Sequence, residues 1–273
     1  MTKAAAAVCA VEREPVIDHM RLANGILMPQ MGIGIVDTFG AKAAEDAVKA
    51  AIKAGFRHIC SSMIYGREKS IARGIRNSGI KREELFMTTV LWNDDIRTNR
   101  ARQAFRQSLA ELETDYVDMY MVNWPVDGFE KAWKSILDYY AEGRIRSLGV
   151  RNFQLKHIKS LMRETGVLPH MIQTESCIHF RDRKFREFCG EKNIAMSVWD
   201  PPCSAELYRK LAPLSERLGR EQQQIVIRSC IQSGFAVMPK ATGRESIFAG
   251  LSALDFKLSD HDMAIIAEAY RDE

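Results

Sequence analysis

The chain has 273 residues, of which 46% are hydrophobic and 27% are charged, a composition that suits one large soluble domain. Its 39 basic and 35 acidic residues are dispersed and leave a net charge of +4. This mild charge argues against a nucleic-acid-binding or membrane-binding surface. No apolar run approaches the length of a transmembrane helix.

The six cysteines are scattered and lack the Cys-x-x-Cys spacing of zinc sites. We therefore expect no metal site, no disulfide framework and a cytoplasmic location. Residues 1–15 contain a short alanine-rich run that Glu12-Arg13-Glu14 ends, which predicts a flexible extension rather than a secretion signal. Residues 16–273 are expected to form a single domain.

The first predicted element is a β-hairpin, indicated by Asn24-Gly25 between two short apolar segments. Short apolar runs then alternate with amphipathic stretches about eight times, which is typical of β/α units around a parallel sheet. The predicted strands are Gln30 to Ile35, Arg57 to Ser61, Phe86 to Thr89, Tyr116 to Val122, Ile145 to Val150, Met171 to Glu175, Ala195 to Val198 and Ala236 to Met238. The predicted helices include Ala41 to Ala54, Thr98 to Leu112, Phe129 to Glu142, Leu155 to Thr165 and Ser215 to Gln232. The fold class is α/β, a (β/α)8 TIM barrel whose N-terminal mouth the hairpin plugs.

One segment, Gly55-Phe56-Arg57-His58-Ile59-Cys60-Ser61-Ser62-Met63-Ile64-Tyr65-Gly66, resembles the pattern G-[FY]-R-H-[IF]-D-T-A-x-x-Y-G of the aldo-keto reductases. Further collinear matches cover nearly the whole chain, and they include Leu22 to Pro29, Arg82 to Phe86, Asn123-Trp124-Pro125, Gly143 to Val150 and Pro239-Lys240. The resemblance implies a barrel in which a nicotinamide delivers hydride to a carbonyl. A tyrosine then acts as general acid, assisted by a lysine, an aspartate and a histidine.

The resemblance places the catalytic tyrosine at Tyr65 and the other three roles at Cys60, Val90 and Asn123. None of these three can replace the family residue, since thiol and valine carry no charge and asparagine does not titrate. A phenol has a pKa near 10, and burial without a neighbouring cation raises it. We therefore expect ordinary carbonyl reduction to be crippled.

The resemblance also implies a partly eroded NADPH site. Asn152 and Gln173 would hold the carboxamide, Trp199 would stack on the nicotinamide, and Lys240 with Arg244 would meet the phosphate of the adenosine end. Arg151 stands where the family has a serine. Trp199 as a packing residue and Lys240 as a solvated one are the alternatives, so NADPH binding is expected to be weakened.

The remaining pocket candidates follow predicted strands, where barrel enzymes place their sites. Trp92, Trp124, Glu175 and His179 would line a pocket for a small organic molecule. Cys60 is a candidate nucleophile if His58, two residues earlier, reaches it. An inert thiol that fills space is the favoured interpretation of Cys60.

Three functions remain open. The first is a repurposed barrel enzyme that performs an isomerisation, dehydration, cyclisation or addition, with Tyr65 as the main acid or base and Asn123 beside it. The second is an NADPH-dependent reductase with an altered mechanism. The third is a non-catalytic binding or structural protein. We expect a small-molecule partner and a monomer.

Overall fold

The computed structural model describes residues 17–36, 40–175, 182–201, 204–241, 247 and 250–270. The expected N-terminal extension, residues 1–15, lies outside the described residues. Two strands, β1 (His19–Arg21) and β2 (Leu27–Pro29), form an antiparallel hairpin whose turn contains Asn24 and Gly25. Gly25 has a φ of 85°, the left-handed conformation that glycine adopts without strain. The predicted hairpin is therefore confirmed.

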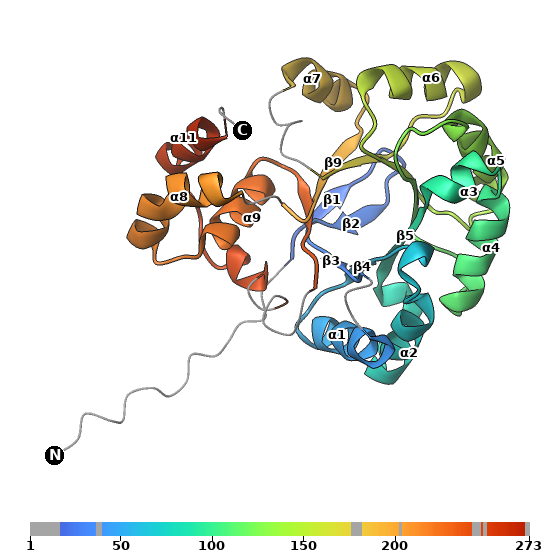
Figure 1. The fold of residues 1–273 in the computed structure, drawn as a ribbon, viewed down its shortest axis with the longest axis horizontal. Coiled ribbons are helices and arrows are strands. Elements are labelled where there is room, and N and C mark those ends of the chain that lie inside the picture. Colours follow the sequence, from blue (N-terminus) through green and yellow to red (C-terminus); the bar gives the residue numbers. More distant parts are fainter. Residues whose placement is uncertain are drawn as a thin grey trace.

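Eight parallel strands form the barrel, in the order β3 to β10 around the sheet. They are β3 (Ile33–Gly34), β4 (His58–Cys60), β5 (Phe86–Leu91), β6 (Met119–Val122), β7 (Leu148–Arg151), β8 (Met171–Thr174), β9 (Ala195–Trp199) and β10 (Ala236–Met238). Parallel bridges from Met31 to Val237 and from Gly34 to Lys240 join the first strand to the last and close the ring. The (β/α)8 TIM barrel predicted from the alternating pattern is confirmed (Figure 1).

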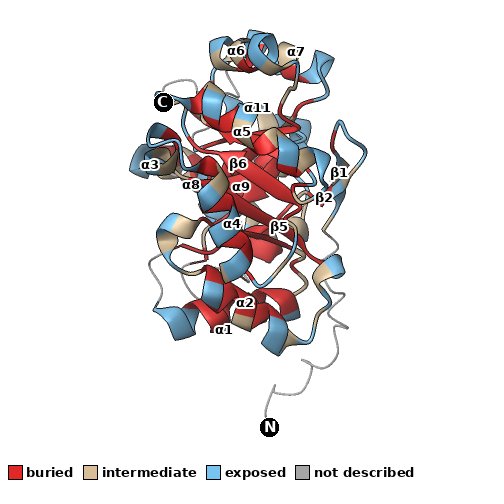
Figure 2. Ribbon diagram, turned by 90° about the vertical axis from the view of Figure 1, so that its right-hand side faces the viewer, coloured by how far each residue is buried: buried red, intermediate tan, exposed pale blue. Residues whose placement is uncertain are grey.

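Helices surround the ring, as Figure 1 shows. They are α1 (Ala41–Lys53), α2 (Glu68–Ser78), α3 (Asn93–Arg97), α4 (Ala101–Glu111), α5 (Phe129–Ala141), α6 (Leu155–Thr165), α7 (Arg183–Glu191), α8 (Ala205–Leu218), α9 (Gln222–Gln232) and α11 (Asp260–Ala269), with short 3-10 turns η1 (Met63–Tyr65), η2 (Arg82–Glu84) and η4 (Ser252–Leu254). Their apolar faces and the outward side chains of the strands form the main hydrophobic core. Figure 2 shows the buried strands enclosed by helices whose outer faces are exposed.

Two predicted helices differ from the structure. Ser215 to Gln232 was predicted as one helix, which is wrong: α8 ends before Gly219, which has a φ of 61°, and α9 begins at Gln222 with Glu221 as its N-cap. A glycine in the left-handed region ends helices in this way. The predicted helix from Thr98 begins early, because Thr98 closes the short helix α3 and α4 starts at Ala101.

The interior of the barrel is a separate, smaller apolar cluster. Side chains alternate between the two faces of a strand, so a second set of residues from each strand points inward. Leu22 and Met28 of the hairpin region belong to this inner cluster, together with Phe86, Met119 and Met171 from the strands. Asn24 also donates a hydrogen bond to the carbonyl of Arg146, just before β7. The hairpin therefore covers the N-terminal end of the barrel, as predicted.

Candidate functional site

The candidate catalytic residues lie at the C-terminal end of the barrel. Cys60 is the last residue of β4, and Tyr65 ends the 3-10 turn η1 that follows it. Val90 is buried near the end of β5, and Asn123 directly follows β6. The predicted clustering of these positions at the carboxyl ends of adjacent strands fits the geometry of the barrel.

The thiol of Cys60 is fully enclosed. Burial raises its pKa to about 12, although the positive charge of Arg151 acts in the opposite direction. His58, on the same strand, shares a hydrogen bond of 2.9 Å with the hydroxyl of Thr88, and burial lowers its pKa to about 3. Both groups are therefore neutral near pH 7, so a thiolate–imidazolium pair does not form.

Tyr65 is half-buried beside an aromatic wall. Its ring meets that of Trp92 edge to face, with 5.9 Å between the centroids. Burial raises the pKa of Tyr65, while the positive charge of Arg151 acts in the opposite direction. The net shift is upward, as the sequence predicted. A cation other than the family lysine nevertheless acts on the phenol.

That cation is Arg151, the last residue of β7. Its side chain lies on the inward face, two residues after Gly149, and only 1% of it is exposed. Its Nη2 donates a hydrogen bond of 3.0 Å to Glu175, and its Cζ lies 4.7 Å from the centre of the Trp199 ring. Its buried Nε has no hydrogen-bond partner among the described residues. A permanent positive charge therefore occupies the mouth of the barrel.

Two amides at the ends of neighbouring strands present unpaired atoms. Asn152 follows β7 with a φ of 57°; its Oδ1 accepts a hydrogen bond of 3.0 Å from the backbone N–H of Glu175, and its buried Nδ2 lacks a partner among the described residues. Gln173 on β8 donates from Nε2 to the hydroxyl of Ser197 at 3.3 Å, and its buried Oε1 has no partner in the part of the chain that the structure describes. One free donor and one free acceptor match the needs of a primary carboxamide.

Trp199, at the end of β9, is buried to 4% exposure and packs over Gly34. A Cβ at Gly34 would lie 2.4 Å from Cη2 of the indole, so only glycine leaves room for the ring. The next residue, Asp200, has a φ of 44° and forms an ion pair of 2.9 Å with Lys240. Lys240 is thus neutralised by a carboxylate rather than simply solvated.

Asn123 is completely buried and donates from Nδ2 to Oδ1 of Asn93 at 3.1 Å. Its Oδ1 has no partner among the described residues, so it offers an acceptor to the pocket. In this orientation Asn123 suits a ligand hydroxyl better than a carbonyl. Trp124 and Ile64, also at this end, are 45% and 49% exposed and form part of an apolar rim.

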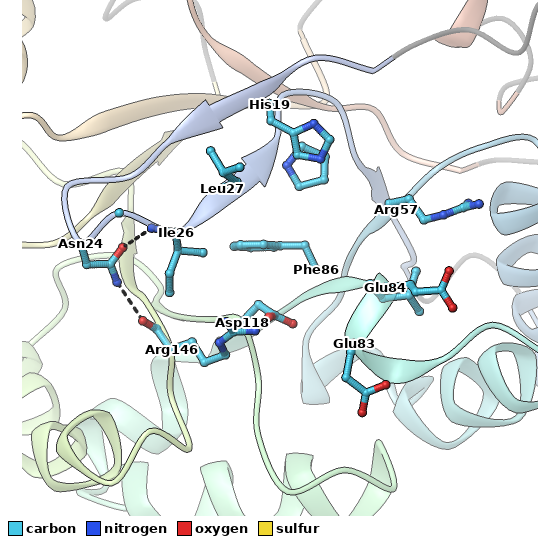
Figure 3. A pocket seen from close by; sticks show the side chains of 13 residues that line it. His19, Asn24, Ile26, Leu27, Arg57, Glu83, Glu84, Phe86, Asp118 and Arg146 are labelled. Carbon is cyan, nitrogen blue, oxygen red and sulfur yellow. Dashed lines mark hydrogen bonds and ion pairs between the residues drawn. The ribbon is translucent and has the colours of Figure 1, made fainter.

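The opposite end of the barrel carries a cavity of about 660 Å³ against the hairpin, lined in part by Phe86, Asp118 and Arg146 (Figure 3). Asp118 accepts hydrogen bonds from Arg146 at 3.0 Å and from the backbone N–H of Met87 at 2.9 Å, and it pairs with Arg82 at 2.8 Å. Both carboxylate oxygens are therefore occupied by the protein itself. We therefore interpret the cavity as a packing gap beneath the hairpin rather than as a ligand site.

The predicted site residues His179 and Arg244 lie outside the described residues. Within the described ranges, no group of three or more His, Cys, Asp or Glu side chains could hold a metal ion. None of the described helices is both long and apolar enough to cross a membrane.

Beyond the loss of the family serine, the sequence carries a signal that the side chain of Arg151 enters the barrel. The two-residue alternation of β7 places residues 149 and 151 on one face, and Gly149 on that face lies against inward-pointing Met121. An arginine at that position must enter the barrel unless the strand is at an edge. The ion pair of Asp200 with Lys240 had no local sequence signal, because it joins residues 40 positions apart.

Comparisons with known proteins agree with this geometry. Residues 30–204 match the Aldo/keto reductase family. The chain is 33% identical over 259 residues to a glyoxal reductase of Bacillus subtilis, a match that covers 94% of both chains. It superposes on an aldo/keto reductase from Brucella melitensis with a TM-score of 0.85 and 34% identity, over 93% of this chain and 98% of that one. A mutant of Gox0644 in complex with NADPH is similar at a TM-score of 0.85 and 28% identity, over 94% and 95%.

Proposed function

Because the chain belongs to the aldo/keto reductase family, we propose that it is an NADPH-dependent reductase of small carbonyl compounds with an altered proton-donating site. The observation that carries the proposal is the pair of unpaired amide atoms, Nδ2 of Asn152 and Oε1 of Gln173. Buried polar groups rarely remain unpaired unless a ligand or water completes them. A nicotinamide carboxamide would satisfy both atoms.

Most of these residues fit the cofactor, whereas Arg151 obstructs the position of its nicotinamide ring. Asn152 and Gln173 would hold the carboxamide, and Trp199 offers an aromatic face for the ring. In this structure, however, the guanidinium of Arg151 covers that face. Binding therefore requires Arg151 to share the face with the ring or to turn away from it. NADPH, when bound, would supply the hydride.

Tyr65 is the group that would give a proton to the carbonyl oxygen. Its phenol lies at the mouth of the barrel beside Trp92, and the positive charge of Arg151 acts on it. The net upward shift of its pKa means that the phenol keeps its proton near pH 7 and is a weaker acid than a free phenol. We therefore expect turnover well below that of a reductase with an intact lysine.

The substrate class follows from the site and from the relatives. Ile64 and Trp124 are exposed apolar side chains at this end of the barrel, and the acceptor on Asn123 suits a hydroxyl or hydrated carbonyl. A small dicarbonyl such as the glyoxal named for the Bacillus subtilis relative meets these requirements. A purely non-reductive reaction, the first of the three functions considered from sequence, has no counterpart in the names of these relatives. The reductase alternative is therefore preferred.

The test is a titration with NADPH that follows quenching of tryptophan fluorescence, together with loss of NADPH absorbance in the presence of glyoxal. We expect saturable binding that weakens about tenfold in Asn152→Asp, where a carboxylate oxygen replaces the free donor. Asn193→Asp is the matched control, since Asn193 also has a positive φ of 52° but lies before β9 at the other end of the barrel. Absence of binding at millimolar NADPH would exclude the reductase. Binding without turnover on any carbonyl would favour the non-catalytic alternative.

A further inference from the structure

Two fully buried side chains lie at the ends of the segment that carries Tyr65. Ser62, at its start, and Glu68, the first residue of α2, are both 0% exposed. Residues 63–67 between them are only partly buried or exposed. Each of the two buried side chains forms a hydrogen bond to β5, so the segment is attached to one strand at both ends.

The first attachment extends the pairing of β4 with β5. The register between these strands ends with Cys60 opposite Thr88. Two residues further along each strand, the hydroxyl of Ser62 donates a hydrogen bond of 2.7 Å to the carbonyl of Val90. The serine side chain therefore keeps the chain on β5 while the backbone turns away into η1.

The second attachment is a carboxyl group in the apolar layer between the strands and the helices. Thr89 lies on the same face of β5 as Met87 and Leu91, which belong to the main core. Its hydroxyl donates a hydrogen bond of 2.6 Å to Oε1 of Glu68, whose buried Oε2 has no partner among the described residues. Burying a carboxyl group for one hydrogen bond costs free energy that an apolar side chain would not. Stability alone therefore does not account for Glu68.

The turn between the two attachments is tight. The backbone N–H of Tyr65 donates to the carbonyl of Ser62 at 3.1 Å, and that of Gly66 donates to the carbonyl of Met63 at 2.9 Å. Gly66 has a φ of 59°, which suits glycine, and it ends η1 just before α2. Displacement of either end should therefore move the Tyr65 ring relative to Trp92, which it meets at 5.9 Å between the centroids.

We propose that Ser62 and Glu68 are positioning residues for Tyr65. Their hydrogen bonds to Val90 and Thr89 hold both ends of the segment on adjacent residues of β5, so the strand fixes where the phenol lies. The effect on catalysis rests on the reductase function proposed above, whereas the effect on the position of the phenol does not. In this arrangement the buried carboxyl group serves the site rather than the core.

The experiment places 3-fluorotyrosine at position 65 and follows its fluorine NMR resonance, which responds to the neighbouring indole and needs neither NADPH nor substrate. Thr89→Val removes the hydrogen bond to Glu68 and keeps a branched side chain on the strand. We expect the resonance to change its chemical shift, and kcat for glyoxal to fall by about tenfold to 10²-fold with little change in KM. Ser62→Ala, at the other end of the segment, should have the same two effects.

Glu68→Gln is the conservative variant, because its amide oxygen can accept the same hydrogen bond from Thr89. Burial raises the pKa of Glu68 to about 7, so a neutral side chain is already populated there near neutral pH. This variant should keep the wild-type resonance and most of kcat. A change as large as that in Thr89→Val would contradict a role that depends on the hydrogen bond.

Thr88→Val is the matched control. Thr88 is the preceding residue of β5, and its hydroxyl shares a buried hydrogen bond of 2.9 Å with His58. The variant loses a bond of the same kind from the same strand, but on the opposite face. It should leave the resonance at position 65 unchanged even where urea unfolding shows the same loss of stability as in Thr89→Val.

A wild-type resonance in both Thr89→Val and Ser62→Ala would overturn the proposal. An equal change in Thr88→Val would also overturn it, because any weakening of β5 would then move the phenol. If Thr89→Val does not fold, Ser62→Ala with Thr88→Val still decides the question. A resonance that responds as expected in a protein that does not bind NADPH would refute the reductase function and leave the positioning role intact.

Discussion

At the N-terminal end of the barrel, the buried carboxylate of Asp118 is fully used, with two arginines and a backbone N–H around it. At the C-terminal end, four side chains each keep a buried polar atom without a partner among the described residues; they are Asn123, Arg151, Asn152 and Gln173. Both ends are built from the same strands and have similar burial. The carboxylate of Asp118 is satisfied by the protein, whereas these four atoms can still bind a ligand. Unpaired atoms are not confined to this end, since His58, Glu68 and Trp133 each keep one as well among the described residues.

The strongest test of this contrast is at Tyr65. Tyr65→Phe removes the proposed proton donor without changing the ring that packs on Trp92. We expect kcat for glyoxal to fall about 10³-fold while the affinity for NADPH and the free energy of unfolding stay close to wild type. Steady-state kinetics with a parallel fluorescence titration measure both. Unchanged turnover would show that another group donates the proton.

The N-terminal end should respond in the opposite way. Asp118→Asn leaves Arg82 and Arg146 without a counter-charge around a buried position that is 3% exposed. We expect the free energy of unfolding, measured with urea, to fall by about 3 kcal/mol, with little change in the affinity for NADPH. If the variant instead lost NADPH affinity at full stability, the cavity beneath the hairpin would have to be reconsidered as a ligand site.

Between the two ends lies His58, which is fully buried with a pKa lowered from 6.5 to about 3 by desolvation. The unfolded chain binds a proton below pH 6.5, whereas the folded protein does not until about pH 3. The stability that His58 contributes is therefore present above pH 6.5 and is lost as the pH falls towards 3.

His58→Asn can keep a hydrogen bond to Thr88. It should reduce the slope of the free energy of unfolding against pH in this acidic range by about 1.4 kcal/mol per pH unit. Urea unfolding of both proteins between pH 6.5 and about pH 4.5 measures the difference in slope. Equal slopes would mean that His58 takes up a proton in the folded barrel.

The sequence predicted the architecture well, because strands buried on both faces produce continuous apolar runs that turn residues separate clearly. The hairpin followed from Asn24-Gly25, a local signal. Helix boundaries were less secure, and Ser215 to Gln232 shows why. The apolar spacing continues across Gly219, and only the backbone conformation of that residue ends the helix.

The site was predicted by position but not by interaction. The sequence placed Tyr65, Asn123 and Trp199 at strand ends, yet it could not show which atoms remain unpaired. Those depend on contacts between distant residues, such as Nδ2 of Asn123 with Asn93, 30 positions away. The sequence alone shows at position 151 the loss of the family serine, whereas the contact of the long Arg151 side chain with Glu175 depends on the fold.

The smallest expected effect concerns the oxidation state of the cofactor. The guanidinium of Arg151 lies 4.7 Å from the centre of the Trp199 ring, so a nicotinamide that shares this face with it lies close to a positive charge. Oxidation gives the nicotinamide a positive charge of its own, whereas NADPH and NADP+ share the same phosphates. Repulsion from Arg151 should therefore weaken NADP+ more than NADPH.

In Arg151→Ser, which restores the residue type of the family, we expect the ratio of the dissociation constants of NADP+ and NADPH to fall by about threefold to tenfold, measured by fluorescence titration of both forms. The affinity for NADPH itself should rise, because the face of Trp199 becomes free. Arg146→Ser, at the satisfied end of the barrel, should leave the ratio unchanged. A ratio that did not respond to Arg151→Ser would mean that the nicotinamide does not stack on Trp199. Binding of the carboxamide by Asn152 and Gln173 would then have to be considered apart from stacking.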